Sequence, residues 1–508
     1  MKKLTLVLAL AIIVAFAGAA YAEVQNVKIS GDIAVYGTSA WYGGLFWDRV
    51  GNAADPNSND GFFISDIGVN VDADLTENVG ARVRLVSELP WGIDMDDGDA
   101  DTRLMVGVGE AYITLREMLY EPLTLTIGRQ PLFYGRGFTV GSNVQDPQNA
   151  VSIYDQYAMY DAFDSVKAQF DLDPWSIDAL WSIIKEDDAP FNFTTSITTW
   201  LADIGYVFDN YNAEVELYYM GLWDRHRNSV TVTSIQTDPT NVTIPVTYRL
   251  QPYQTNTFGL RGSVEPIDNL NIFAEGAYQF GHLGDADYNA LGQIVGLKNR
   301  KVSAGAGEVG AEYLWADVIC QPKIGVQFSY REGEKFNTRG EAGGTYNAFY
   351  SPFMRRSDMA IYGHNGRYGI RNVVAPAAGN IQNPAGLYYK NGDFANTVDT
   401  GDTSWDQNMM APIGALSLKP LAAMDIDDVT LGVKYAYYQF AAAPVGGRKK
   451  HAGQEINGLL TYDYTEDVQF HLLFGYFWRG SYYKFGTVLA PDVAPHSALL
   501  EAAVKLTF

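Results

Sequence analysis

Apolar and polar residues alternate with a period of two along much of this chain. In the last twelve residues, 497–508, every even-numbered residue from Leu500 to Phe508 is apolar, whereas Glu501, Lys505 and Thr507 are polar. A period of two places the two sets on opposite faces of a β-strand. The C-terminus is therefore predicted to be a strand with one apolar and one polar face.

The same alternation recurs in pairs of segments that are joined by short turns. Residues 63–74 and 79–88 form one pair, and the others span 166–185, 200–223, 257–280, 303–331, 415–438 and 454–479. Long and short connections alternate, which is typical of bacterial barrels with short periplasmic turns and long outer loops. The pattern predicts an all-β protein, a transmembrane antiparallel up-and-down β-barrel of about 18 strands.

The first 22 residues have the composition of a secretory signal peptide. Lys2 and Lys3 precede the apolar run 4–16, and Ala20-Tyr21-Ala22 is a small-residue cleavage site. The apolar run is too short to span a bilayer. We predict that residues 1–22 are removed and that residues 23–508 form a barrel in the outer membrane of a Gram-negative bacterium, in contact with its lipid.

The amino-acid composition limits which ligands and cofactors this protein can bind. The formal charge of −23 argues against nucleic acid or anionic lipid as a specific ligand. Cys320 is the single cysteine, so an internal disulfide and a Cys-x-x-Cys-His haem attachment are both excluded. The 33 Tyr, 25 Phe and 10 Trp are compatible with a barrel, in which lipid-facing and lumen-facing residues alternate.

The terminal residue is a candidate insertion signal. A chain that ends on an aromatic residue of an alternating strand resembles the terminal signal by which outer-membrane barrels are recognised. We predict that the barrel-assembly machinery recognises Phe508, and that the inserted barrel is a monomer.

Two strands near residue 120 carry a family resemblance. They contain Gly109-Glu110-Ala111-Tyr112 and Leu125-Thr126-Ile127-Gly128-Arg129-Gln130, with Gly135 beyond. Here the chain resembles the alginate export family of outer-membrane porins, in which an Ala-Tyr strand pairs with a strand that ends in Gly-Arg-Gln. Residues 163–167 resemble the family's Phe-Asp-Gly-Val strand, with Ser165 in place of glycine. The resemblance implies passive export or diffusion of an anionic polysaccharide or a related organic acid.

Arg129 is at odds with the simple alternation. Leu123, Leu125 and Ile127 have outward parity, which also directs Arg129 towards lipid. An arginine at the bilayer midplane costs ~2–4 kcal/mol. Either a bulge at Gly128 resets the parity, or Arg129 lies at the rim; the bulge is the preferred interpretation.

The inward-facing positions of the predicted strands carry both acidic and basic residues. In one interpretation they pair with each other and rigidify the wall, and in the other they form a charged track that selects solutes. The inward acidic residues include Glu308 and Glu312. The cations that we assign to the solute path are Arg82, Arg84, Arg129, Lys167, Arg261 and Arg479.

The longest connection, residues 332–403, is predicted to insert into the lumen and constrict it. Loops of this length without secondary structure are usually functional or disordered. Arginine forks bind carboxylates and aromatic faces stack on sugar rings, which suits an acidic saccharide. Alternatively, the arginines pair with Glu308 and Glu312 and hold the loop in place. The residues that we assign to this constriction are Arg355, Arg356, Arg367, Arg371, Tyr350 and Tyr368.

Other functions find less support. There is no Gly-x-Ser-x-Gly, no His-Glu-x-x-His and no phosphate loop, so we expect no enzyme, no metal centre and no cofactor. The acidic loop 94–101 has its glycine, Gly98, one place too early for an EF-hand, which favours a solvated loop, with weak binding of divalent ions as the other interpretation. The remaining alternatives are a general or cation-preferring porin for small hydrophilic solutes, and a sheath around an electron-transfer partner whose haem comes from another chain.

Overall fold

The computed structural model describes residues 26–41, 59–91, 106–141, 162–185, 197–225, 231–237, 243–249, 253–288, 294–333, 344–349, 359–361, 409–422, 428–442, 449–481 and 496–508. The signal peptide and the acidic loop 94–101 lie outside these residues. Among the described residues, none of the helical segments has the length and apolar character of a membrane span.

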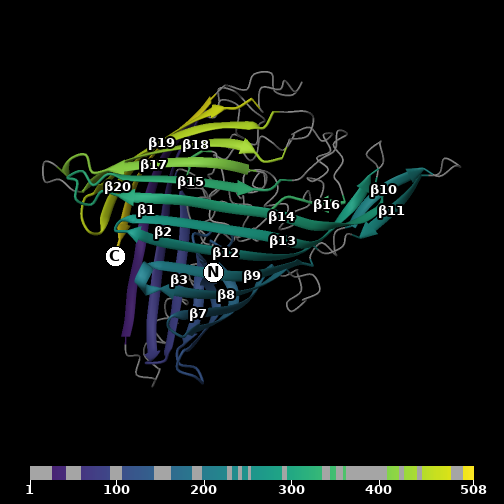
Figure 1. Ribbon diagram of the computed structural model, residues 1–508, viewed down its shortest axis with the longest axis horizontal. Coiled ribbons are helices and arrows are strands. Elements are labelled where there is room, and N and C mark those ends of the chain that lie inside the picture. The colour runs from purple at the N-terminus through teal and green to yellow at the C-terminus, as the bar shows by residue number, and fades with distance from the viewer. Residues whose placement is uncertain are drawn as a thin grey trace, which may run out of the picture.

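Eighteen strands form one closed antiparallel barrel (Figure 1). Neighbours in the sequence are neighbours in the barrel, and β1 closes it by pairing with β21, where Val35 lies opposite Val504. The prediction of an up-and-down barrel is therefore confirmed. The strands are β1 (Asn26–Trp41), β2 (Asn59–Thr76), β3 (Val79–Pro90), β4 (Gly107–Leu115), β5 (Leu123–Pro131), β6 (Ala162–Asp171), β7 (Trp175–Lys185), β8 (Ile197–Phe208), β9 (Ala213–Asp224), β12 (Tyr253–Ile267), β13 (Leu270–Tyr288), β14 (Ile294–Leu314), β15 (Lys323–Arg331), β17 (Met409–Leu418), β18 (Val429–Phe440), β19 (His451–Asp463), β20 (Val468–Arg479) and β21 (His496–Thr507).

Four small elements lie outside this sequence of strands. β10 (Thr231–Thr237) and β11 (Thr243–Arg249) form a separate hairpin between β9 and β12, which projects beyond the right-hand end of the barrel in Figure 1. β16 (Thr345–Tyr346) pairs in parallel with β14, and the short helix η2 (Asp209–Tyr211) forms the turn between β8 and β9. The β10–β11 hairpin was not predicted from the sequence.

The two faces of the barrel wall have opposite character. Apolar side chains point outward and stay exposed, for example Ile29 at 65% and Leu260 at 56%. Polar side chains of the other parity are buried inside, and Thr257 and Gln279 are fully buried. Exposed apolar surface costs ~25 cal/mol per Å² in water, so an apolar belt of this kind requires lipid around it.

The region around Gly128 corrects one prediction. Pairing is continuous along the whole of β5, with Arg129 opposite Ala111 on β4 and Asp164 on β6. No extra residue interrupts the ladder, so the bulge at Gly128 is wrong. Arg129 keeps the outward parity of Ile127 and lies two residues before the end of its strand. Gly128 is needed instead for its φ of 128° and because a methyl group there would overlap the carbonyl oxygen of Ala111.

The chain leaves the wall after Pro131, the last residue of β5. Residues 132–141 turn into the barrel, and we call them the inner strap. Leu132 and Val140 of the strap are buried against Phe163, Leu180 and other inward apolar side chains of β6 to β9. This cluster fixes the base of the strap on the inner wall.

Candidate functional site: the lumen and its inner strap

The inner strap is a tight hairpin. The Tyr134 N–H donates to the Val140 carbonyl oxygen over 2.9 Å, and Phe133 forms an isolated bridge with Gly141. At the tip, Gly135 and Gly137 have φ values of 62° and 77° on either side of Arg136. Glycine adopts this left-handed backbone without steric cost. The tip can therefore reverse direction within three residues and present the arginine side chain to the lumen.

One side of the strap is held by β7, β9 and β13. The Tyr134 hydroxyl donates to Asp178 Oδ2 over 3.1 Å. The Thr139 hydroxyl lies 2.6 Å from the Tyr218 hydroxyl, which donates to Glu275 Oε1 over 2.7 Å. Because Tyr218 and Thr139 are both buried, these bonds are shielded from competing water. They attach the strap to the wall at two separate points.

The arginine at the tip reaches much further round the barrel. Arg136 Nη2 lies 3.2 Å from Glu312 Oε1, and Arg136 Nε lies 3.8 Å from Glu308 Oε1. Its guanidinium carbon stands 3.6 Å above the centre of the Phe273 ring. Both glutamates are on β14, the seventh strand after β5 in the barrel order. The strap therefore bridges the lumen from one part of the wall to another.

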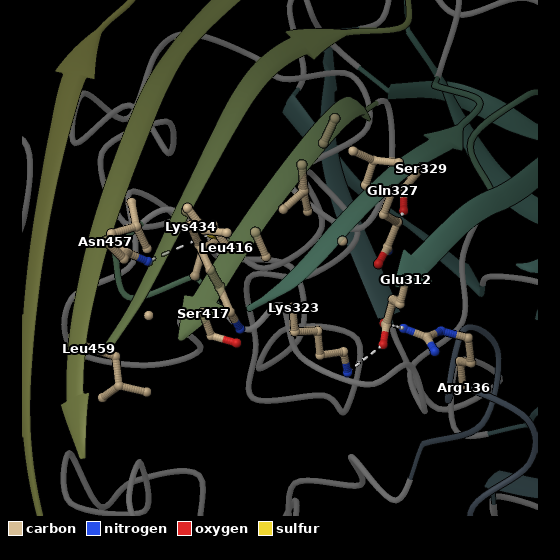
Figure 2. Close-up of a pocket in the computed structure, with 18 of the residues that line it drawn as sticks. Arg136, Glu312, Lys323, Gln327, Ser329, Leu416, Ser417, Lys434, Asn457 and Leu459 are labelled. Carbon is tan, nitrogen blue, oxygen red and sulfur yellow. Dashed lines mark hydrogen bonds and ion pairs between the residues drawn. The ribbon is translucent and has the colours of Figure 1, made fainter. Parts of the chain in front are cut away.

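A cavity of about 400 Å³ opens beside the tip of the strap (Figure 2). Figure 2 shows Arg136 and Lys323 converging on Glu312, and Lys323 Nζ lies 2.8 Å from Glu312 Oε2. The lining has four cationic side chains and two acidic ones. The charged lining residues are Arg136, Lys323, Arg331, Lys434, Glu308 and Glu312, and the uncharged polar ones are Gln327, Ser329, Ser417, Thr430, Asn457 and Thr461.

Arg136 was missed by the sequence analysis. A signal was present in the sequence. Gly135-Arg136-Gly137 lies shortly after the predicted strand that contains Gly128-Arg129-Gln130, and glycines on both sides of a charged residue indicate a turn that presents its side chain. One prediction from the sequence was that arginines of the long connection pair with Glu308 and Glu312 and hold that loop in place. The structure places Arg136 of the inner strap in that role.

Among the predicted lumenal cations, Arg82 and Arg84 are engaged in ion pairs within the wall. Arg82 Nε lies 2.7 Å from Glu110 Oε2, and Arg84 Nη2 lies 2.6 Å from Asp32 Oδ1. Both side chains point inward, as their parity predicts. These pairs match the interpretation in which lumenal charges rigidify the wall.

Lys167 and Arg261 also have acidic partners on neighbouring strands. Lys167 Nζ lies 3.1 Å from Asp178 Oδ2, and Arg261 forms a bidentate pair with Glu216. Arg479 lies at the last position of β20 on the inward parity, whereas Arg129 faces outward. A contact between any of these cations and a solute stays a prediction.

Beyond residues 332–333, which continue from β15, the structure describes residues 344–349 and 359–361 of the long connection, and both stretches lie inside the barrel. Phe349 stacks on Phe138 of the inner strap with ring centroids 6.2 Å apart. Further along, the Ile361 N–H donates to Glu455 Oε1 over 2.7 Å. Arg355, Arg356, Arg367, Arg371, Tyr350 and Tyr368 lie outside the described residues, so their role as a constriction stays a prediction.

Phe508 extends the ladder that closes the barrel. Its N–H donates to the Gly31 carbonyl oxygen over 3.0 Å, and the Gly31 N–H donates back over 2.8 Å. The ring lies on the outward parity and is about half exposed. This position is open to an external protein, and recognition of Phe508 during assembly stays a prediction.

Comparison with known proteins finds one matching family and several structures with a similar fold. Residues 37–386 match the family described as Alginate export. The fold is similar to that of Acinetobacter baumannii OccAB1, at 10% identity, with 96% of this chain and 99% of that chain covered and a TM-score of 0.50. A BenF-like porin from Pseudomonas fluorescens Pf-5 is 9% identical over 96% and 100% of the two chains, with a TM-score of 0.49. The structure of Pseudomonas aeruginosa OccK2 (OpdF) in complex with glucuronate is 10% identical, with 96% of this chain and 99% of that chain covered and a TM-score of 0.47.

The sequence matches no curated protein. The match to the family is nevertheless extensive, because it covers well over half of the 508 residues. The chain therefore belongs to the alginate export family, and its 18-stranded barrel is a porin-like channel of the outer membrane.

Proposed function

We propose that this channel is a passive diffusion pathway for small anionic solutes, namely organic acids or acidic sugars. The observation that carries the proposal is the charge of the cavity beside the strap. Four cationic and two acidic side chains line it, in a chain whose formal charge is −23. The local sign is therefore the reverse of the overall sign, and it lowers the free energy of a carboxylate in this part of the lumen.

The shape of the lumen favours a small solute over a polymer. A cavity of about 400 Å³ is in the size range of ordinary small-molecule sites. Its uncharged polar groups, such as Gln327 and Asn457, offer hydrogen bonds to hydroxyl groups. The inner strap crosses the lumen beside it, and a long saccharide chain would have to displace that strap at every passage.

Planar-bilayer reversal potentials of the purified channel test the selectivity. Potassium glucuronate is placed on both sides of the bilayer at different concentrations. We expect the sign of the reversal potential to show that the channel prefers the anion. Replacing Lys323 and Lys434 together with glutamine removes two positive charges from the cavity. At an effective dielectric constant of ~20, each charge contributes ~1 kcal/mol to the binding of an anion ~16 Å away, so the two together contribute ~2 kcal/mol and the preference should fall about thirtyfold.

Lys301→Gln is the matched control, because Lys301 lies on the outward parity of β14 and should leave the reversal potential unchanged. A cation-selective wild-type channel would contradict the proposal and favour the general or cation-preferring porin.

The same measurement on a variant with Arg355, Arg356, Arg367 and Arg371 all changed to Ala tests whether the long loop contributes to selectivity. A shift towards cations at low salt is expected if these arginines contribute to selectivity.

A further inference from the structure

Glu312 on β14 binds two cations that come from different parts of the barrel. Its Oε1 lies 3.2 Å from Arg136 Nη2 of the inner strap, and its Oε2 lies 2.8 Å from Nζ of Lys323, the first residue of β15 (Figure 2). Each carboxylate oxygen thus has its own charged donor, and such charge-assisted hydrogen bonds are about twice as strong as neutral ones. Glu312 is therefore held as a free carboxylate would be held between an arginine and a lysine.

The other carboxylate of the cavity is bound differently. Glu308 Oε2 accepts from Gln327 Nε2 over 2.6 Å and from Ser329 Oγ over 2.8 Å, whereas Arg136 Nε approaches Glu308 only to 3.8 Å. Gln327 and Ser329 are uncharged side chains of β15, so they fix Glu308 on the wall whether or not Arg136 is beside it. Glu308 is consequently part of the wall.

Glu312 depends on its two cations alone. Among the described residues, Arg136 and Lys323 are its only hydrogen-bond or ion-pair partners. The side chains of Glu312, Arg136 and Lys323 are 30%, 35% and 48% exposed, against 10% for Glu308, and all of them line the cavity. Water can therefore hydrate Glu312 when it leaves its partners, and the exchange leaves no buried unpaired charge.

We propose that Glu312 occupies the carboxylate site of the empty channel. A solute carboxylate replaces it between Arg136 and Lys323, and this exchange loosens the tip of the inner strap from β14. The inference rests on the proposed function, because it takes the passing solute to be an anion. It adds which two cations receive the solute and what its arrival does to the strap.

The exchange is specific for carboxylates because of their shape. A carboxylate presents two oxygens, which can take the places of Oε1 and Oε2 of Glu312, and the arginine fork matches that geometry. Chloride is a single atom and cannot reproduce both contacts. Organic acids should therefore displace Glu312 at concentrations at which chloride does not.

The test measures the chloride current of the full chain in a planar bilayer while potassium glucuronate is added. The quantity compared is the half-effect concentration, at which the glucuronate-dependent change in current reaches half its full amount. Glu312→Gln and Glu308→Gln each remove one negative charge from the same cavity, so a general electrostatic gain in anion binding is common to both. Only Glu312→Gln also removes the competitor for Arg136 and Lys323. Its half-effect concentration should be about tenfold lower than that of Glu308→Gln, a difference of ~1.4 kcal/mol.

Glu312→Asp separates competition from charge and serves if Glu312→Gln does not assemble. It keeps the negative charge but shortens the side chain by one methylene, so it holds the two cations less well. The half-effect concentration should fall below the wild-type value, whereas a purely electrostatic role leaves it unchanged. Heat-modifiable migration on gels establishes that each variant is a folded barrel before recording.

The open fraction of single channels reports the strap. In potassium chloride alone, wild type should have a low open fraction that rises when glucuronate is added, and Glu312→Gln should have the higher value without glucuronate. The inference is overturned if the half-effect concentrations of Glu312→Gln and Glu308→Gln are equal, or if glucuronate leaves the wild-type open fraction unchanged. In either case an anion-selective wild-type reversal potential still upholds the proposed function, whereas a cation-selective one refutes that function itself.

Discussion

Two groups of lumenal charges in this barrel use the same residue types with different consequences. In the first, which we call the wall cluster, Asp32, Asp72, Arg82, Arg84 and Glu110 pair across β1 to β4. The second surrounds the inner strap, where Arg136 pairs with a glutamate 176 residues away in the sequence. Partners in the wall cluster are 10 to 52 residues apart.

The difference lies in what each pair connects. Ion pairs of the wall cluster join strands that backbone hydrogen bonds already hold together, so they add rigidity to an existing contact. The pairs of Arg136 join a strap to strands with which it shares no ladder, and they decide whether that strap stays in the lumen. Ion pairs in the first group should therefore affect stability, whereas ion pairs in the second should affect conduction.

The largest expected effect is loss of the strap itself. Phe133 and Gly141 already form a bridge, so residues 134–140 can be replaced by Asn-Gly, the turn that suits a two-residue hairpin. The barrel should assemble, because the wall ladder is untouched, and single-channel conductance should rise severalfold. A conductance equal to that of the wild type would show that the strap does not obstruct the path.

Arg136→Gln should have the next largest effect. It removes the ion pairs with Glu308 and Glu312, a loss of ~2 kcal/mol for partly buried charge-assisted hydrogen bonds. The strap should detach more often, so bilayer recordings should show a higher open fraction and weaker anion preference. Arg82→Gln, which removes a wall-cluster cation, serves as the control and should change neither quantity. Equal effects of the two variants would remove the distinction between the two groups.

Within the wall cluster, Arg84→Met should lower stability rather than alter conduction. The pair with Asp32 is about two-thirds to five-sixths buried, and breaking it leaves Asp32 without its charged partner, which should cost ~2 kcal/mol. Urea unfolding in detergent, followed by tryptophan fluorescence, measures the loss. The double variant Arg84→Met, Asp32→Asn should recover part of it, and additive losses would mean that the two side chains are not coupled.

The smallest expected effect concerns a glycine beneath the same arginine. A methyl group at Gly68 would overlap the Arg84 guanidinium, so Gly68→Ala must displace the side chain from Asp32 and should cost ~1 kcal/mol. Gly414→Ala is the control, since no atom of the described residues lies within 4 Å of the added methyl group. Equal unfolding midpoints for the two variants would show that the position of Arg84 is not fixed by Gly68.

Much of the architecture was predictable from local pattern. The period of two assigned the outward face of nearly every strand, as for Ile67 and Val69, because a strand in a bilayer has only lipid on one side and lumen on the other. The strand count followed from the alternation of short and long connections. The bulge at Gly128 was wrong because a glycine with positive φ can be accommodated in a continuous ladder, and periodicity does not report φ.

The sequence by itself determined which side chains face lipid and which face the lumen, since that follows from parity along a single strand. It did not determine which lumenal charges meet. Arg82 and Glu110 meet because their strands are neighbours, whereas Arg136 and Glu312 meet because a strap leaves the wall after Pro131 and crosses the interior. Only closure of the barrel brings β5 and β14 to opposite ends of that strap. The tertiary structure alone therefore decided which cations rigidify the wall and which hold the strap in the lumen.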